Sequence, residues 1–466
     1  MRRRLRRALF WVLIVLSLLV AGVVSFVAIW IAPTGTGFVS KLMCSGVFVG
    51  GLEPERVKRE ELLPQWFVSA EVDREAREVT STLAGLAPRT AVYREGLGCT
   101  IAVGVTPDEL RAATPEQPPR PLASELPWPR GDGSPSALDP EIDQDALAAA
   151  LDFAFDDVDP ARPLWTRAVV VAHRGVLVAE RYAPGVTPET PLLGWSMTKS
   201  VTATFVGMLA LDGALDVHAP APVPQWRGDE RAAITIDQLL RMSSGLEFEE
   251  VYGPLTDATA MLFESHDTVA LPMAKPLAHA PDAVWSYSSG TTNILSWIVR
   301  RAVERDGGWP AYASFPRRRL FDPLGMRTAV IEPDASGTFV GSSFMYASAR
   351  DWARFGLLHL QDGVWEGRRL LPEGWVEYVR TPTPSAPKGE YGAQWWTNVG
   401  VPEGAADRRF PSLPTDTFQA SGYQGQAVVV IPSRELVFVR LGVTHDRSVY
   451  DLDATVARVL AALPGA

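Results

Sequence analysis

The chain has 466 residues, of which 47% are hydrophobic and 21% are charged, a composition typical of globular proteins. The length allows a membrane segment plus two or three folded units, or one large domain with a small appendage. The formal net charge at pH 7 is −10, and removing five positive charges for Arg2, Arg3, Arg4, Arg6 and Arg7 leaves −15 for the remainder. This acidity argues against a nucleic-acid partner, and neither a Walker-type phosphate loop nor a dinucleotide fingerprint is present.

The N-terminus predicts a membrane segment. The arginines precede residues 8–32, which carry no charge. A helix of this length, at about 1.5 Å per residue, crosses a hydrocarbon core of about 30 Å. The arginines should stay in the cytoplasm, so the rest of the chain is expected in the periplasm or outside the cell. The alternative is a cleaved signal peptide, but the run exceeds the usual core of about 7–15 residues and no small-x-small site follows it. We therefore predict an uncleaved single-pass anchor over residues 1–33, in the cytoplasmic (inner) membrane.

Residues 34–106 are expected to form a small unit. Its two cysteines, Cys44 and Cys99, lie in strand-like apolar runs, and its charged middle, residues 55–61 and 72–83, favours helices. Two cysteines outside the cytoplasm usually pair, so we predict one disulfide that ties the ends of the unit. The alternative is two buried free thiols. Neither cysteine has a histidine at dyad or ligand spacing, which argues against a thiol nucleophile.

Residues 107–140 are rich in proline and predict an extended, exposed linker. Residues 141–466 are then the folded catalytic domain. Two antiparallel hairpins are expected in it, residues 167–173 with 176–182 and residues 426–431 with 435–441. The expected helices cover residues 144–155, 196–212, 235–242, 292–303, 348–360 and 451–463. Strands at both ends with helices between them predict an antiparallel sheet with an inserted helical layer.

Ser196 and Lys199 lie three residues apart at the expected start of a buried helix. Residues at this spacing share a helix face, so the lysine amine can reach back to the serine oxygen. A serine is a weak nucleophile until a base takes its proton, and an amine in an apolar wall can be that base. The spacing recurs at Ser385 and Lys388, but prolines exclude a regular helix there. A capping serine beside a snorkelling lysine is the alternative.

Further motifs follow in order along the chain. They are Leu-Leu-Arg-Met-Ser-Ser-Gly-Leu at residues 239–246, Trp-Ser-Tyr-Ser-Ser-Gly at 285–290 and Ala-Ser-Gly-Tyr-Gln-Gly-Gln at 420–426. Together with the Ser-x-x-Lys motif they resemble the serine β-lactamase and penicillin-binding-protein superfamily, in particular its class C-like branch of esterases, D-amino-acid peptidases and 6-aminohexanoate-dimer hydrolases. The resemblance covers roughly residues 160–460. It implies an α/β (α+β) fold of the β-lactamase/transpeptidase type, with an antiparallel sheet flanked by helices and a helical subdomain.

Within this resemblance, Tyr287 is the tyrosine of the second motif. A tyrosine acts as a base only where a cation favours its phenolate, and Lys199 is the candidate cation. We expect Ser196, Lys199 and Tyr287 to be the catalytic residues, with Tyr287 or Lys199 deprotonating Ser196 and returning the proton to the leaving group. The alternative for Tyr287 is a core tyrosine at the start of a helix.

An oxyanion needs two N–H donors, which we expect from the Ser196 backbone and from Tyr423 or Gln424. Gly422 beside them allows the backbone to approach a substrate, although a simple turn before a hairpin is the alternative. Tyr252 resembles a substrate-facing tyrosine of the 6-aminohexanoate-dimer hydrolases, and a structural loop tyrosine is the other interpretation.

Two positions depart from the family pattern. Ser289 stands where the second motif has asparagine, and Ser421 stands where the third has lysine or histidine. In lactamases that cation helps to bind a substrate carboxylate, so its absence weakens a β-lactam interpretation. Esters, amides and short oligomers of amino acids remain as candidate substrates. The histidines are scattered, and no metal or organic cofactor is expected.

The sequence therefore predicts a membrane-anchored serine hydrolase that acts on a small ester, amide or peptide-like substrate through an acyl-enzyme on Ser196. A penicillin-binding or peptidoglycan-sensing module without turnover is an alternative from another class. A DD-peptidase or a β-lactamase is a further alternative.

Overall fold

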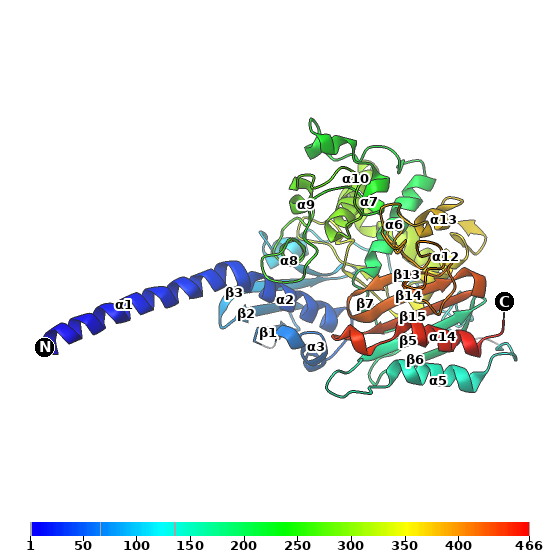
Figure 1. Ribbon diagram of the computed structural model, residues 1–466, viewed down its shortest axis with the longest axis horizontal. Helices are drawn as coiled ribbons and strands as arrows, with labels where there is room; N and C mark the ends of the chain where they lie inside the picture. The colour runs from blue at the N-terminus through cyan, green and yellow to red at the C-terminus, as the bar shows by residue number, and fades with distance from the viewer. Residues whose placement is uncertain (1, 66, 135–136, 466) are drawn as a thin grey trace.

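The computed structural model describes residues 2–65, 67–134 and 137–465. A long N-terminal helix projects from a body that holds a small sheet beside this helix, a larger sheet with helices on its faces, and a mainly helical region above (Figure 1). The helices of the body's N-terminal part are α2 (Ala32–Phe48), α3 (Pro54–Glu60), α4 (Pro107–Ala112) and α5 (Gln144–Phe155). Those that follow are α6 (Met197–Leu211), α7 (Ile236–Leu240), α8 (Asp257–Phe263), α9 (Ala270–Ala274), α10 (Ser289–Pro316), α11 (Asp322–Leu324), α12 (Ala349–Leu360), α13 (Trp375–Arg380) and α14 (Leu452–Ala462).

The larger sheet is antiparallel and has the order β12-β13-β14-β15-β5-β6. Its strands are β5 (Thr166–His173), β6 (Val176–Tyr182), β12 (Trp396–Thr397), β13 (Phe418–Gly422), β14 (Gln426–Ile431) and β15 (Leu436–Gly442). Both predicted hairpins are confirmed, and β15 pairs with β5, which joins the two ends of residues 141–466. Shorter strands elsewhere are β7 (Leu192–Leu193), β8 (Val330–Ile331), β9 (Met345–Ala347), β10 (Val364–Trp365) and β11 (Arg368–Arg369).

Side chains of the sheet alternate between two hydrophobic layers, as expected for extended backbone. Val170 and Val428 pack on the side of α6 and α12, whereas Val171 and Phe438 pack on the side of α5 and α14. Both faces are therefore covered, which agrees with the burial of β5, β14 and β15 at every position. α6, which carries the Ser-x-x-Lys motif, lies in the first layer.

The predicted helices of the catalytic domain are confirmed. Thr235 forms a capping box with Gln238 at the start of α7, and Ser348 caps α12. α5 and α14 match their predicted ranges to within a residue. α10 begins closer to Tyr287 than predicted and is longer, with a kink at Gly308.

The apolar N-terminal segment is helical. α1 (Arg2–Phe26) continues through a π-helical turn, η1 (Val27–Ile31), directly into α2. Within the described residues this is the one helix long and apolar enough to cross a membrane, although a signal sequence passes the same test. α1 is exposed along its apolar length, while most of α2 is buried in the body. The chain therefore passes from a membrane-type helix into the folded domain without a flexible connection.

The N-terminal unit differs in part from the prediction. α3 is confirmed, but residues 72–83 belong to the sheet β1 (Ser69–Asp73), β2 (Glu78–Leu83), β3 (Leu86–Arg94) and β4 (Gly98–Ile101). The prediction of helix failed because Val79 and Ser81 alternate inward in a Thr- and Val-containing strand, a period of two that the charged residues obscured.

The run around Cys44 was predicted as a strand and is part of α2. This helix is buried on almost every side, so its sequence lacks the amphipathic period that identifies a helix. The predicted disulfide is present: Cys44 of α2 is bonded to Cys99 of β4, with a Cα–Cα distance of 6.0 Å.

The prediction of an exposed linker at residues 107–140 is wrong in two respects. The segment begins with α4, which a capping box at Thr106 starts. Farther on, Arg354 of α12 donates to the carbonyl oxygens of Pro129 and Gly131, and Trp128 is buried against the domain. The segment is thus attached to the catalytic domain along part of its length. Residues 135 and 136 of the predicted linker, and residues 1 and 466 of the outermost predicted segments, lie outside the described residues.

A buried ion pair attaches the N-terminal unit to the catalytic domain. Lys41 of α2 contacts Glu332, and both side chains are almost completely buried. Glu332 also accepts hydrogen bonds from the Ser45 hydroxyl (2.8 Å) and the Cys99 amide (2.6 Å). Burial lowers the pKa of Lys41, and the charge of Glu332 opposes that shift. The disulfide and the ion pair are thus adjacent parts of one buried polar junction.

We predict that Glu332→Leu lowers the free energy of unfolding by about 3–5 kcal/mol, because it leaves the Lys41 ammonium buried without its partner. The control is Glu95→Leu, which removes a carboxylate from the exposed pair with Arg77 and should cost less than about 1 kcal/mol. Denaturant unfolding of the full-length protein in detergent measures both values. Equal effects of the two substitutions would contradict a supporting role for the junction.

Candidate active site

Ser196 stands at the N-terminus of α6, as the sequence predicted. Its side chain makes no capping hydrogen bond, which removes the interpretation of Ser196 as a simple helix cap. Trp195 before it has a φ of +48°, a left-handed conformation that is costly for a side chain of this size and is found where a site requires a particular direction. The turn thus presents the Ser196 hydroxyl away from the helix backbone.

Lys199 lies one turn farther along the same helix face. Its Nζ is 3.1 Å from the Ser196 Oγ, and the side chain is 1% exposed, so it does not snorkel to solvent. The same Nζ donates to the Ser289 hydroxyl (2.9 Å) and the Ser342 carbonyl oxygen (3.0 Å). Burial lowers the pKa of Lys199 to about 8, against the opposing charge of Glu250. A fraction of this amine is therefore neutral near neutral pH and available to accept a proton.

Tyr287 closes the other side of the nucleophile. Its hydroxyl forms a hydrogen bond with the Ser196 side chain, and the Lys199 Nζ lies 4.9 Å from its ring centroid. Burial and the charge of Glu250 raise the pKa of Tyr287, although the bond to Ser196 opposes the shift. Tyr287 is thus a neutral phenol, able to donate and accept a proton. The three residues predicted as catalytic are brought together.

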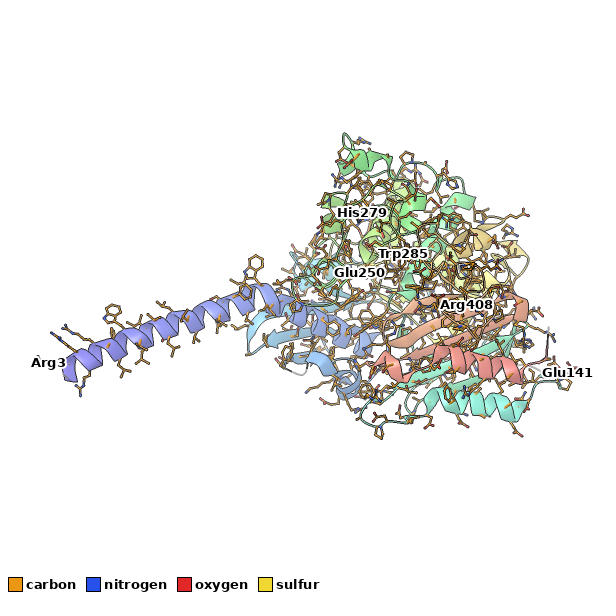
Figure 2. The ribbon with its side chains drawn as sticks, viewed as in Figure 1. Arg3, Glu141, Glu250, His279, Trp285 and Arg408 are labelled. Atoms are coloured by element: carbon orange, nitrogen blue, oxygen red, sulfur yellow. A yellow bond between two sulfur atoms is a disulfide. The ribbon has the colours of Figure 1, made fainter. Side chains whose placement is uncertain are left out.

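Glu250 is part of this cluster, and the sequence did not single it out. Its carboxylate accepts hydrogen bonds from the backbone amide and the hydroxyl of Ser289, both at 2.6 Å, and from the Tyr252 hydroxyl at 3.1 Å. Ser289 therefore connects Glu250 to Lys199. Glu250 lies near the centre of the molecule, between the helical region and the larger sheet (Figure 2). Its neighbour Glu249 has the same chemistry at an exposed position, so no local pattern distinguished the two.

The loop after β13 lies against the turn that carries Ser196. A Cβ on Gly422 would be 2.2 Å from the Gly194 carbonyl oxygen, so only glycine allows this approach. Gln424 has a φ of +61°, and its side chain accepts a hydrogen bond from the Trp195 indole at 3.3 Å. Within the described parts of the chain, neither the Ser196 amide nor the Tyr423 amide is hydrogen-bonded to another residue. The predicted loop thus lies beside the turn that carries Ser196.

Tyr252 is linked to both sides of this site. Besides its bond to Glu250, it forms a hydrogen bond with Ser289, and its ring stacks on Tyr423 with a centroid distance of 6.2 Å. Burial raises the pKa of Tyr252 well above its ordinary value, so it remains protonated. These contacts place Tyr252 at the edge of the site around Ser196 rather than in a remote loop.

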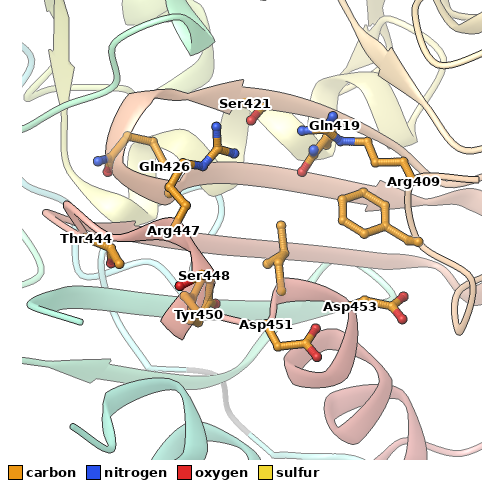
Figure 3. A pocket seen from close by; sticks show the side chains of 13 residues that line it. Arg409, Gln419, Ser421, Gln426, Thr444, Arg447, Ser448, Tyr450, Asp451 and Asp453 are labelled. Carbon is orange, nitrogen blue, oxygen red and sulfur yellow. The ribbon is translucent and has the colours of Figure 1, made fainter. Parts of the chain in front are cut away.

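Ser421, the position that lacks the family cation, lines a cavity of about 430 Å³ on the other side of β13 (Figure 3). Arg409 and Arg447 enter this cavity on the side of Ser421, opposite Asp451 and Asp453. Neither arginine forms an ion pair with any residue that the structure describes. Burial and the nearby Arg447 charge lower the pKa of Arg409 to about 10.

Both arginines act on Tyr287, since their charges oppose the increase in the pKa of this residue. The Arg409 guanidinium lies 4.2 Å from the centroid of Trp396, which stacks on Tyr287 at 5.4 Å. Positive charge is therefore present beside the third motif, but it comes from residues 409 and 447 rather than from the strand itself. Sequence reasoning missed both, because no motif or fixed spacing relates them to Ser196.

No three His, Cys, Asp or Glu side chains are grouped as metal ligands among the residues that the structure describes. The arrangement instead holds a hydroxyl between an amine of lowered pKa and a neutral phenol, next to two free backbone amides. This combination can activate an alcohol, stabilise an oxyanion and move a proton to a leaving group.

Comparison with known proteins agrees with this geometry. A family model described as Beta-lactamase matches residues 165–463. The 6-aminohexanoate-dimer hydrolase of Paenarthrobacter ureafaciens is 27% identical over 287 residues, which cover 55% of this chain and 70% of that protein. Esterase EstB of Burkholderia gladioli is 28% identical over 218 residues, 41% of this chain and 54% of the esterase. A penicillin-binding protein homologue from Caulobacter crescentus has a TM-score of 0.52 at 16% identity, covering 69% of this chain and 99% of its own, and shows the fold.

We predict that Glu250→Gln lowers the pKa of Lys199 below about 8, because the carboxylate charge is what favours the ammonium. The chain has only five lysines, so the Nζ resonances of ¹⁵N-lysine-labelled protein can be titrated individually. Glu249→Gln is the matched control and should leave the value unchanged. An unaltered or higher pKa in Glu250→Gln would show that the Glu250 charge does not act on Lys199.

Proposed function

Because the chain belongs to the beta-lactamase family, we propose that it is a serine hydrolase that cleaves an ester or amide bond through an acyl-enzyme on Ser196. The observation that carries the proposal is the contact of both Lys199 and Tyr287 with the one Ser196 hydroxyl. The named activities of the two relatives, an amide-dimer hydrolase and an esterase, support a carbonyl substrate of either kind.

In the proposed mechanism, the neutral amine of Lys199 accepts the Ser196 proton as Oγ attacks the carbonyl carbon. The oxyanion lies between the amides of Ser196 and Tyr423. The proton then passes through the Tyr287 hydroxyl to the leaving alcohol or amine, and the carbonyl–leaving-group bond breaks. Water repeats the sequence on the acyl-enzyme: its proton goes to Lys199, the acid is released, and Ser196 regains a proton. The raised pKa of Tyr287 favours Lys199 as the base and Tyr287 as the relay.

We further propose that the protein stays in the cytoplasmic membrane, with its catalytic domain in the periplasm or outside the cell. The continuity of α1 with the buried helix α2 supports an uncleaved segment, because α2 is part of the folded body. The arginine cluster before the apolar run supports the orientation.

Substitutions at the two Ser-x-x-Lys pairs should distinguish the proposed active centre from the second copy of the motif. Ser196→Ala is expected to abolish labelling by a fluorophosphonate, and Lys199→Met or Tyr287→Phe to lower kcat/KM for a p-nitrophenyl ester by about 10²–10⁴. Ser385→Ala and Lys388→Met have the same spacing in a loop and should change neither. Labelling that survives in Ser196→Ala would contradict the assignment.

The same experiment tests the alternative of a binding or sensing module. Release of product over many turnovers supports the hydrolase. Stoichiometric labelling by a penicillin or an ester without release supports the sensor. Nitrocefin and muropeptides, added in parallel, test the β-lactamase and DD-peptidase activities.

Membrane anchoring predicts that the protein remains in the membrane fraction after an alkaline carbonate wash and that its intact mass includes the N-terminal arginines. Replacing Leu16 and Leu19 of α1 with arginine should release the protein from membranes, because a charge at mid-bilayer costs about 2.5–3.5 kcal/mol per residue. A mature protein that starts after residue 26 would instead identify a cleaved signal sequence.

A further inference from the structure

An apolar chamber lies between the N-terminal unit and the catalytic domain. Its volume is about 280 Å³, close to the lower end of small-molecule pockets, at about 300 Å³. The N-terminal unit contributes one wall and the catalytic domain the other. The larger part of the chamber surface is apolar, and the side chains that line the chamber include Ile31, Phe38, Val68, Leu83, Trp195 and Phe263.

The chamber shares its inner wall with the catalytic site. Trp195, which directly precedes the nucleophile, lines it, and so do Tyr252 and Tyr423. The Trp195 ring meets Tyr423 edge-on at 5.7 Å, and Tyr423 stacks on Tyr252. These three rings border the chamber on the side of Ser196, so an apolar part of a substrate whose carbonyl lies at Ser196 can pack against them.

The chamber also lies at the end of the membrane-type helix. A hydrocarbon core of about 30 Å takes about 20 residues of helix at 1.5 Å each, so a segment that enters at Ala8 leaves the core near Val27. Ile31, Ala32 and Gly35, which line the chamber, follow within about 12 Å of that point. The rigid continuation of α1 into α2 therefore holds the chamber at the level of the lipid headgroups.

Two hydroxyl groups in the chamber wall already donate hydrogen bonds within the protein. The Thr34 hydroxyl donates to Glu264, and the Thr259 hydroxyl donates to the Gly253 carbonyl oxygen at 2.6 Å. These two hydroxyls are therefore not available to a ligand. The rest of the chamber wall is mainly hydrocarbon and aromatic. A peptide or sugar would find few polar partners there beyond Gln65 and Tyr423, whereas a hydrocarbon chain has no polar groups to leave unpaired.

We propose that the chamber binds the acyl chain of a lipid-derived ester or amide, which reaches Ser196 from the membrane surface. This rests on the proposed hydrolase activity and names its substrate class. Ser196 attacks the acyl carbonyl, the bond to the headgroup breaks, and the headgroup alcohol or amine leaves with the proton delivered through Tyr287. Water then hydrolyses the acyl-serine and releases the fatty acid. The N-terminal unit is accordingly part of the substrate-binding site.

The first test is a chain-length series of p-nitrophenyl esters, from acetate to dodecanoate, hydrolysed by the full-length protein in detergent. We expect kcat/KM to rise about fourfold for each methylene until the chamber is filled. Hydrolysis of acetate with no gain for longer chains would overturn the acyl-chain proposal and leave the hydrolase intact. No hydrolysis of any ester, together with no labelling of Ser196, would instead overturn the proposed function.

The second test narrows the chamber. A Cβ on Gly35 would make only ordinary contacts, 3.6 Å from Gln65 and 3.7 Å from Val68, so Gly35→Leu can fill the space without a backbone clash. It should lower kcat/KM for octanoate at least tenfold and leave acetate within twofold. Gly22→Leu is the matched control, since Gly22 is also helical and has open space around it. An equal loss for both esters would contradict the proposal.

Phe38→Ala provides an independent variant should Gly35→Leu fold poorly. It enlarges the chamber, so the preferred chain should become longer by two or more methylenes. The native ligand class is tested by incubating the protein with vesicles of phospholipid and of N-acyl amino-acid amphiphiles and measuring released fatty acid. Release that requires Ser196 and falls in Gly35→Leu supports the proposal, and its absence for every long-chain substrate overturns it.

Discussion

The amine of Lys199 is buried without a carboxylate in direct contact, and the arrangement of the site follows from this constraint. An ammonium in an apolar environment loses solvation, which shifts its equilibrium toward the neutral amine. The three hydrogen bonds of Lys199 go to a nucleophile, a serine and a backbone carbonyl, while the nearest acidic charge, on Glu250, acts through Ser289. The Glu250 charge thus opposes the fall in the pKa of Lys199 without cancelling it.

The same chain contains a second buried lysine with the opposite arrangement. Lys41 contacts the Glu332 carboxylate directly, so the two charges compensate each other and fasten α2 to the catalytic domain. The two lysines differ in one respect. Lys41 contacts a carboxylate directly, whereas the Ser289 side chain lies between Lys199 and the carboxylate of Glu250. The polar junction at Lys41 also fixes the unit that forms the outer wall of the chamber, which ties the stability of the N-terminal part to the shape of the chamber.

The fold brings together the end of a membrane-type helix, a disulfide-linked unit and a catalytic cleft. Because α1 runs into α2 without a loop, the orientation of the cleft relative to the N-terminal apolar helix is set by one continuous helix. On the far side of the nucleophile, Arg409 and Arg447 supply positive charge beside Ser421 and Tyr287. The site therefore lies between an apolar side that faces the membrane helix and a charged side that faces the larger sheet.

Features that depend on residue type or on neighbours in the chain could be predicted from the sequence. The three-residue spacing of Ser196 and Lys199, the caps at Thr235 and Ser348, the hairpins of the larger sheet and the pairing of the two cysteines depend on neighbours in the chain or on residue type, and the structure contains them. The strands of residues 72–83 and the helix around Cys44 could not be predicted. Charged residues hid the period of two in the strands, and burial on almost every side hid the helical period around Cys44.

Only the tertiary structure decided which distant charges act on Lys199 and Tyr287. Glu250, Arg409 and Arg447 lie 54, 213 and 251 residues from Ser196, and no sequence pattern connects side chains that loops carry to one place. The chamber likewise exists only because α2 and the N-terminal sheet pack against Trp195 and Phe263. Residue types and spacing determined what chemistry the chain can perform, whereas packing between distant segments determined the pKa values, the shape of the cleft and its position beside the membrane helix.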